Sequence, residues 1–149
     1  MALDYQITMD CAEPLELSRF WASALGYLAE DNSALIEQVA AQGLATEDDS
    51  TVVDGRRAWI TLAAIRHPDD PVHAFTGAGL GRRMLFQQVP EPKTVKNRVH
   101  LDLRSGPEGR DAEVARLEAL GATVVTVIEE PGASHECMLD PEGNEFDVQ

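Results

Sequence analysis

Residues 140–149 read DPEGNEFDVQ, and this closing stretch is the most informative part of the chain. Its first five residues contain a proline and a glycine–asparagine pair, which are the residue types of a tight turn. The residues that follow alternate polar and apolar, which is the two-residue period of a strand. Asp147 therefore lies on the polar face of this predicted strand, opposite Phe146 and Val148.

A second segment alternates in the same way. Residues 98–103 read RVHLDL, so His100 projects from the polar face of another predicted strand. A carboxylate and an imidazole on the polar faces of two strands suggest a site. An alternative is that His100 only lines a pocket and bonds to Asp102, Arg98 or the backbone.

The composition limits the classes of partner. Twelve Lys and Arg residues face twenty-six Asp and Glu residues in 149 positions, for a net charge of −14. Such a surface repels phosphate backbones and anionic lipids, so we expect no nucleic acid and no membrane partner. No signal peptide is visible, which predicts a cytoplasmic protein. The two cysteines make no disulfide framework, and we expect both to be packing residues.

The chain contains an internal repeat. A strand over 5–10 and a helix over 13–25 are matched by a strand over 98–103 and a helix over 107–120, and both helices end in Ala-Leu-Gly. Counted back from the two glycines, Gln6 and His100 stand at near-equivalent positions. The helix must cover the apolar face of its sheet, so both side chains are expected on the opposite face.

Further strands complete each repeat. They are predicted over 27–30, 59–65 and 83–89 in the first half, and over 122–128, 134–139 and 145–148 in the second. The unit is therefore βαβββ, present twice. We predict one domain over 1–149, with module one at about 1–90, module two at about 96–149 and a proline hinge at 90–92. Residues 34–45 suit a short helix, and 46–55 and 66–80 are expected to be loops.

Two βαβββ units with these landmarks resemble the vicinal oxygen chelate superfamily. This superfamily includes glyoxalase I, extradiol dioxygenases, fosfomycin-resistance enzymes and bleomycin-binding proteins. The likeness is closest to small glyoxalase-like domain proteins and covers nearly the whole chain. Three segments carry it: LFQQVPEPK at 85–93, KNRVHLDL at 96–103 and DPEGNEF at 140–146. It implies an α+β fold in which the two modules form a cup-shaped mixed sheet, with helices on the outer face.

The resemblance also implies where ligands would lie. In metal-dependent members they come from the first and last strands of each unit, which here offer Gln6, Gln87, His100 and Asp147; a bulge would present Gln88 instead. A neutral amide oxygen is a weaker ligand than imidazole or carboxylate. We therefore expect no cofactor and no tightly held divalent metal, although any metal that did bind would use these four residues.

Three functions remain open at this stage. The first is an enzyme without a strong metal, in which His100 or Asp147 acts as general acid or base on a small oxygenated molecule. The second is a metal-dependent lyase, isomerase or dioxygenase. The third is a non-catalytic protein that sequesters a drug or metabolite, as bleomycin-resistance proteins do. Trp59 is either core or a stacking surface for the ligand, and His135 could face the cup, although alternation alone does not place it. A homodimer is expected, because open sheet edges need covering.

Overall fold

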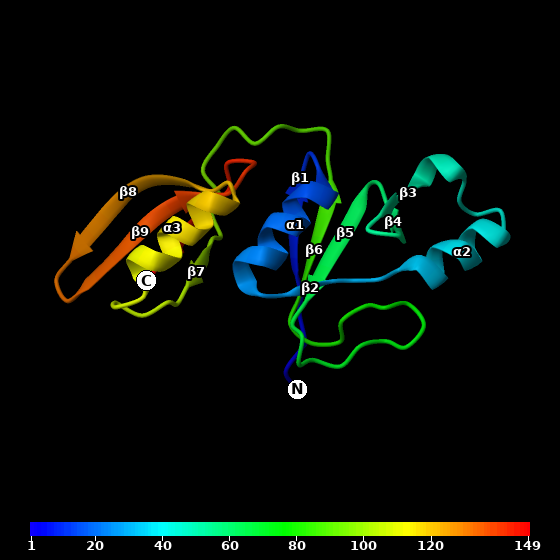
Figure 1. The fold of residues 1–149 in the computed structure, drawn as a ribbon, viewed down its shortest axis with the longest axis horizontal. Helices are drawn as coiled ribbons and strands as arrows, with labels where there is room; N and C mark the ends of the chain where they lie inside the picture. The colour runs from blue at the N-terminus through cyan, green and yellow to red at the C-terminus, as the bar shows by residue number, and fades with distance from the viewer. The chain divides into compact units, whose positions relative to one another are not determined.

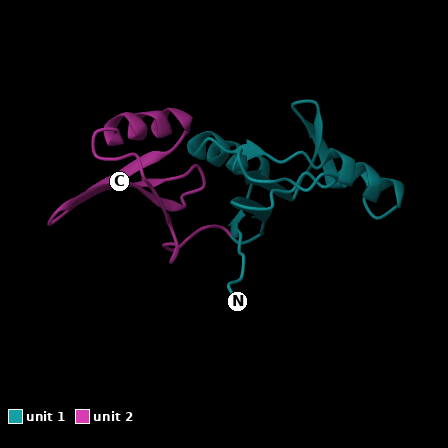
Figure 2. Cartoon of the chain, turned by 90° about the horizontal axis from the view of Figure 1, so that it is seen from below, with its two compact units in different colours: residues 1–91 teal, residues 92–149 magenta.

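The computed structural model describes residues 1–149, which divide into two compact units, 1–91 and 92–149 (Figure 2). Each unit holds a mixed sheet of four strands with one helix packed against it (Figure 1). We call the sheet face away from that helix the open face of the unit.

The first unit runs strand, helix, strand, strand, strand. Its sheet and helix consist of β1 (Ile7–Cys11), α1 (Pro14–Leu25), β2 (Leu28–Ala29), β5 (Leu62–Arg66) and β6 (Arg83–Gln88). The strand order is β1-β6-β5-β2, and β1 is parallel to β6. Met84 and Phe86 are buried on the side of α1, so Arg83, Leu85 and Gln87 alternate onto the open face.

An insertion separates β2 from β5. It consists of α2 (Ser33–Ala41), the 3-10 turn η1 (Glu47–Asp49) and a hairpin of β3 (Ser50–Val53) and β4 (Arg56–Trp59). The predicted helix over 34–45 is confirmed in a shorter form. The loop predicted over 46–55 was wrong, because Asp54 and Gly55 both have positive φ and close a tight hairpin. The strand predicted over 59–65 is confirmed as β5, although it begins only at Leu62. Trp59 therefore ends β4 and does not begin β5.

The second unit repeats the topology of the first. Its elements are β7 (Leu101–Leu103), α3 (Arg110–Leu120), β8 (Thr123–Glu130), β9 (Ala133–Leu139) and β10 (Glu145–Val148). The strand order is β7-β10-β9-β8, and β7 is parallel to β10. The predicted α+β class with two βαβββ modules is confirmed.

The strand registers match the two repeats residue by residue. Ile7 pairs with Met84 in the first unit, and Leu101 pairs with Phe146 in the second. Gln6 and His100 each directly precede the first strand of their unit, which confirms their equivalence. Both strands begin later than predicted, at Ile7 and Leu101.

The closing turn forms as the sequence predicts. The Asp140 carboxylate accepts hydrogen bonds of 2.9 Å from the backbone N–H groups of Glu142 and Asn144, and Gly143 adopts a φ of 85°. Asp140 and Asn144 are both buried. Their hydrogen bonds satisfy polar groups that would otherwise be costly to bury, so this part of the motif is structural.

The helix ends also follow the sequence. Pro14 occupies the first turn of α1, and Gly26 and Gly121 cap α1 and α3 in the left-handed conformation with φ of 67° and 111°. None of the helices has the length and apolar character that crossing a membrane requires.

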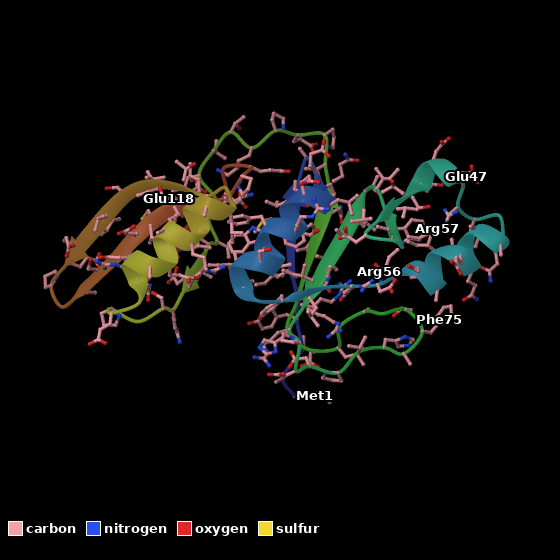
Figure 3. All side chains as sticks on the ribbon, viewed as in Figure 1. Met1, Glu47, Arg56, Arg57, Phe75 and Glu118 are labelled. Atoms are coloured by element: carbon pink, nitrogen blue, oxygen red, sulfur yellow. The ribbon has the colours of Figure 1, made fainter.

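Phe146 anchors the last strand in the core of the second unit, with an exposed fraction of 0%. We expect Phe146→Ala to lower the free energy of unfolding by about 3–5 kcal/mol, because it removes a large buried side chain and leaves a cavity. Urea titration followed by circular dichroism measures this loss. Phe75→Ala is the matched control, since Phe75 lies in the loop before β6 and is 45% exposed (Figure 3). A loss below about 1 kcal/mol for Phe146→Ala would contradict its role in the core.

Candidate functional site

The parallel pairing of β7 with β10 brings His100 next to Asp147. Asp147 is the register partner of Asp102, and His100 stands two residues before Asp102 on the same side of the chain. His100 Nδ1 lies 2.9 Å from Asp102 Oδ1 and 3.7 Å from Asp147 Oδ2. The two residues that the sequence singles out are therefore neighbours on the open face of the second unit.

The contact between His100 and Asp102 orients the imidazole. An ionised carboxylate only accepts hydrogen bonds, so Nδ1 of His100 carries the proton of this bond. The other oxygen of Asp102 accepts a hydrogen bond of 3.1 Å from the Gln149 side chain. The side chain of His100 is 38% exposed, and its contacts with Asp102 and Asp147 both involve Nδ1.

Two further residues on β9 join this site, and the sequence analysis did not assign them to it. Cys137 is the register partner of Asp147 and is only partly buried, whereas Cys11 is buried as expected. His135 lies two residues away on the same face, with Nε2 3.7 Å from Asp147 Oδ2. The pairing of β9 with β10 would have revealed both residues, but alternation within one strand does not supply that register.

The environment of Cys137 keeps its thiol protonated. Burial, and then the neighbouring Asp147 carboxylate, raise the pKa of Cys137 to about 11. Both effects disfavour a thiolate, the first by removing water and the second by charge repulsion. Cys137 is therefore not an activated nucleophile in the protein as it stands.

The equivalent region of the first unit is occupied by an ion pair. Arg83 donates from Nη1 to Oε1 of Gln6 at 2.6 Å, and its Nε and Nη2 bind the Glu30 carboxylate at 2.7 and 2.8 Å. The Glu30 side chain is fully buried and also accepts the backbone N–H of Gly79 at 2.7 Å. The amide oxygen of Gln6 is thus already hydrogen-bonded to the guanidinium group of Arg83.

The other candidates of the first unit lie apart from Gln6. Gln87 is exposed near the far end of β6, where its register partner is Asp10. By the same register, Leu85 pairs with Thr8 as Asp147 pairs with Asp102, so the equivalent of Asp147 in this unit is apolar. Gln87 stands two residues beyond that position.

Trp59 belongs to a different surface. It lines a cavity of about 270 Å³ beside α1 and the β3–β4 hairpin, together with Arg19, Arg56 and Arg57. Neither Gln6 nor Gln87 lines this cavity. The structure thus brings His100 and Asp147 together and separates Trp59 from the two glutamines. The predicted convergence of four residues on one inner face stays a prediction; these residues are Gln6, Gln87, His100 and Asp147.

The topology and the site together define a class. Two βαβββ units, each with its first strand parallel to its last, are the architecture of the vicinal oxygen chelate superfamily, and His100 and Asp147 lie on the open sheet face of the second unit. A family model described as the Glyoxalase-like domain matches residues 6–149. The chain belongs to this family of glyoxalase-like domain proteins.

Solved structures share the fold at low sequence identity. A hypothetical protein from S. aureus is 14% identical with a TM-score of 0.60, covering 99% of this chain and 93% of its own. A glyoxalase/bleomycin resistance protein/dioxygenase family enzyme from Burkholderia phytofirmans is 13% identical with a TM-score of 0.58, covering 96% and 94%. No curated protein matches the sequence.

A third neighbour carries a metal. It is a mutant of the fosfomycin resistance protein FosX from Listeria monocytogenes, complexed with Mn(II) and 1S,2S-dihydroxypropylphosphonic acid. It is 10% identical with a TM-score of 0.59, covering 100% of this chain and 90% of its own.

The first unit does not fit a manganese centre of that kind. Mn²⁺ favours carboxylate, carbonyl and water oxygens. Here the Gln6 oxygen already accepts a hydrogen bond from a guanidinium, and Leu85 stands where the repeat would place a carboxylate. A cation bound at the Gln6 oxygen would have to displace the hydrogen bond from Arg83 Nη1.

The buried ion pair of the first unit can be tested by removing one charge. We expect Glu30→Gln to destabilise the protein by about 3 kcal/mol, because Arg83 is mostly buried and would lose its only bidentate carboxylate. Urea titration measures the change. Glu16→Gln is the control, since the Glu16–Arg19 pair is exposed on α1 and is worth at most about 1 kcal/mol. Equal effects of the two substitutions would show that the Glu30–Arg83 pair has no special role.

The raised pKa of Cys137 predicts slow alkylation. In a Cys11→Ser variant, iodoacetamide at pH 8 should modify Cys137 at least about tenfold more slowly than an ordinary thiol, because little thiolate is present. Asp147→Asn should speed the reaction by removing the neighbouring negative charge. Mass spectrometry in the presence of a chelator follows the rate. Alkylation as fast as that of a free cysteine peptide would contradict the raised pKa of Cys137.

Proposed function

We propose that this protein binds a small oxygenated organic molecule on its open sheet faces, with His100 and Asp147 as the principal polar contacts. The observation that carries the proposal is the arrangement of His100, Asp102 and Asp147. Asp102 orients the imidazole through Nδ1 at 2.9 Å, and Asp147 Oδ2 lies 3.7 Å from the same nitrogen. Groups positioned in this way recognise hydroxyl and carbonyl oxygens without further rearrangement.

The same arrangement supports acid–base catalysis. With its proton on Nδ1 held by Asp102, the neutral imidazole of His100 presents an unprotonated Nε2. That atom can take a proton from a hydroxyl group, an acidic carbon or a water molecule next to the bound substrate. The proton then resides on Nε2, and the Asp102 carboxylate stabilises the imidazolium that forms.

The two alternative functions are metal-dependent catalysis and sequestration of a drug or metabolite, and a different observation bears on each. A metal-dependent reaction that uses the four predicted ligands is disfavoured by two features. Arg83 donates a hydrogen bond to the Gln6 oxygen, and the apolar Leu85 stands where the repeat would place a carboxylate. Sequestration of a drug or metabolite uses the same contacts without proton transfer. Turnover of the bound molecule, followed by chromatography, separates catalysis from binding.

The proposed partner is a single small molecule for each site, in a cytoplasmic homodimer. The support for the dimer is β8, an edge strand of the second sheet on which Val125 and Val127 are 56% and 47% exposed. An unpaired edge with apolar side chains is a surface that a second copy of the chain would cover.

A ligand screen tests the proposal directly. Small aromatic and oxygenated metabolites are compared by thermal shift, because a ligand that binds the native state raises the midpoint of unfolding. His100→Ala should then weaken the affinity for the best compound about tenfold, the value of roughly one hydrogen bond. The melting temperature without ligand should hardly change, since His100 buries little apolar surface.

The control for this experiment is His73→Ala. His73 is exposed in the loop before β6, where its Nδ1 accepts a backbone hydrogen bond from Thr76. It should leave ligand affinity unchanged. If His100→Ala and His73→Ala bind the compound equally well, the proposed contact at His100 is refuted.

A further inference from the structure

Three potential metal ligands meet on the open face of the second unit without any contribution from the first. They are His135 and Cys137 on β9 and Asp147 on β10. Asp147 and Cys137 are register partners, and His135 follows on the same face of β9. The donor atoms of the three side chains all lie within 4.8 Å of one another. This set shares only Asp147 with the four ligands expected from the sequence.

The spacing within this group suits a shared ion. Asp147 Oδ2 and His135 Nε2 are 3.7 Å apart, which is longer than a hydrogen bond of about 2.7–3.2 Å. A tetrahedral zinc ion holds nitrogen and oxygen at about 2.0–2.2 Å and sulfur at about 2.3 Å, so its ligand atoms lie roughly 3.3–3.6 Å from one another. Small side-chain rotations are enough to bring all three donors to that separation.

The donor types select the metal. Thiolate and imidazole are ligands that zinc favours, whereas manganese favours oxygen. One thiolate and one carboxylate together balance the charge of a divalent ion. Three protein ligands leave a fourth position for water or an oxygen of a bound molecule, as in catalytic zinc sites.

We propose that His135, Cys137 and Asp147 form a Zn²⁺ site within the second unit. Binding replaces the thiol proton of Cys137, which is released to solvent. His100 stays outside the coordination sphere, because its Nδ1 is engaged by Asp102 at 2.9 Å. The inference goes beyond the proposed function, since it needs no organic ligand and does not involve the imidazole of His100.

Cobalt substitution tests the site on the whole chain. Protein prepared with a chelator and then freed of it is titrated with Co²⁺, and near-ultraviolet thiolate-to-cobalt absorption is recorded. We expect a band that saturates at one cobalt ion per chain and is abolished by one equivalent of Zn²⁺. X-ray absorption of the zinc form should show one sulfur ligand at about 2.3 Å.

Matched variants identify the ligands. Cys137→Ser should abolish the band. His135→Ala should weaken Zn²⁺ binding at least about tenfold, because removing a residue that only supports a metal ligand already lowers metal affinity by about 10- to 100-fold. Cys11→Ser and His100→Ala should keep both the band and the affinity. Circular dichroism of each variant shows whether it remains folded.

Three results would overturn the site. The first is no thiolate band, or one that appears only at millimolar cobalt. The second is a band that persists in Cys137→Ser and disappears in Cys11→Ser. The third is zinc binding lost in His100→Ala and kept in His135→Ala, which would assign the ion to His100, Asp102 and Asp147. None of these results depends on ligand affinity, so failure of the zinc site and failure of the proposed function can be told apart.

Discussion

The parallel pairing of the first strand with the last strand in each βαβββ unit is the constraint on which the other features depend. These strands are the ends of the repeat, and in the second unit the pairing joins Leu101 to Phe146. Burial of Phe146 and Val148 on the side of α3 holds the last strand in place. Once this register is set, strand alternation sends Asp102, Asp147 and Cys137 to the open face as a row across three strands.

The two repeats carry different residue types at the matching positions of this strand register. In the first unit the row contains Thr8 and Leu85, and a guanidinium bound to buried Glu30 covers the amide of Gln6. In the second unit the matching row contains carboxylates and a thiol, flanked by two imidazoles. The first unit therefore fills these positions with an apolar residue and an ion pair, whereas the second brings carboxylate, thiol and imidazole groups together.

Membership of the family accounts for the fold of the chain but does not determine which side chains line its open sheet faces. The neighbours share the fold at 10–14% identity, a level at which site residues need not be kept. In this chain Arg83 contacts Gln6 in one unit and Cys137 lies beside Asp147 in the other. A guanidinium disfavours a metal cation next to it, and sulfur is a softer donor than a carboxylate oxygen.

Alternation, caps and turn residues are local signals, and they were enough to predict the repeat, the βαβββ order and the turn at 140–144, and to single out His100 and Asp147. They misplaced Trp59, since the Asp-Gly hairpin turn before β4 was not recognised. The three-dimensional fold was needed to show that His135 and Cys137 join Asp147, that Asp102 orients His100 and that Arg83 covers Gln6. These contacts depend on the register between strands that are distant in sequence, and on the reach of long side chains, neither of which a two-residue period contains.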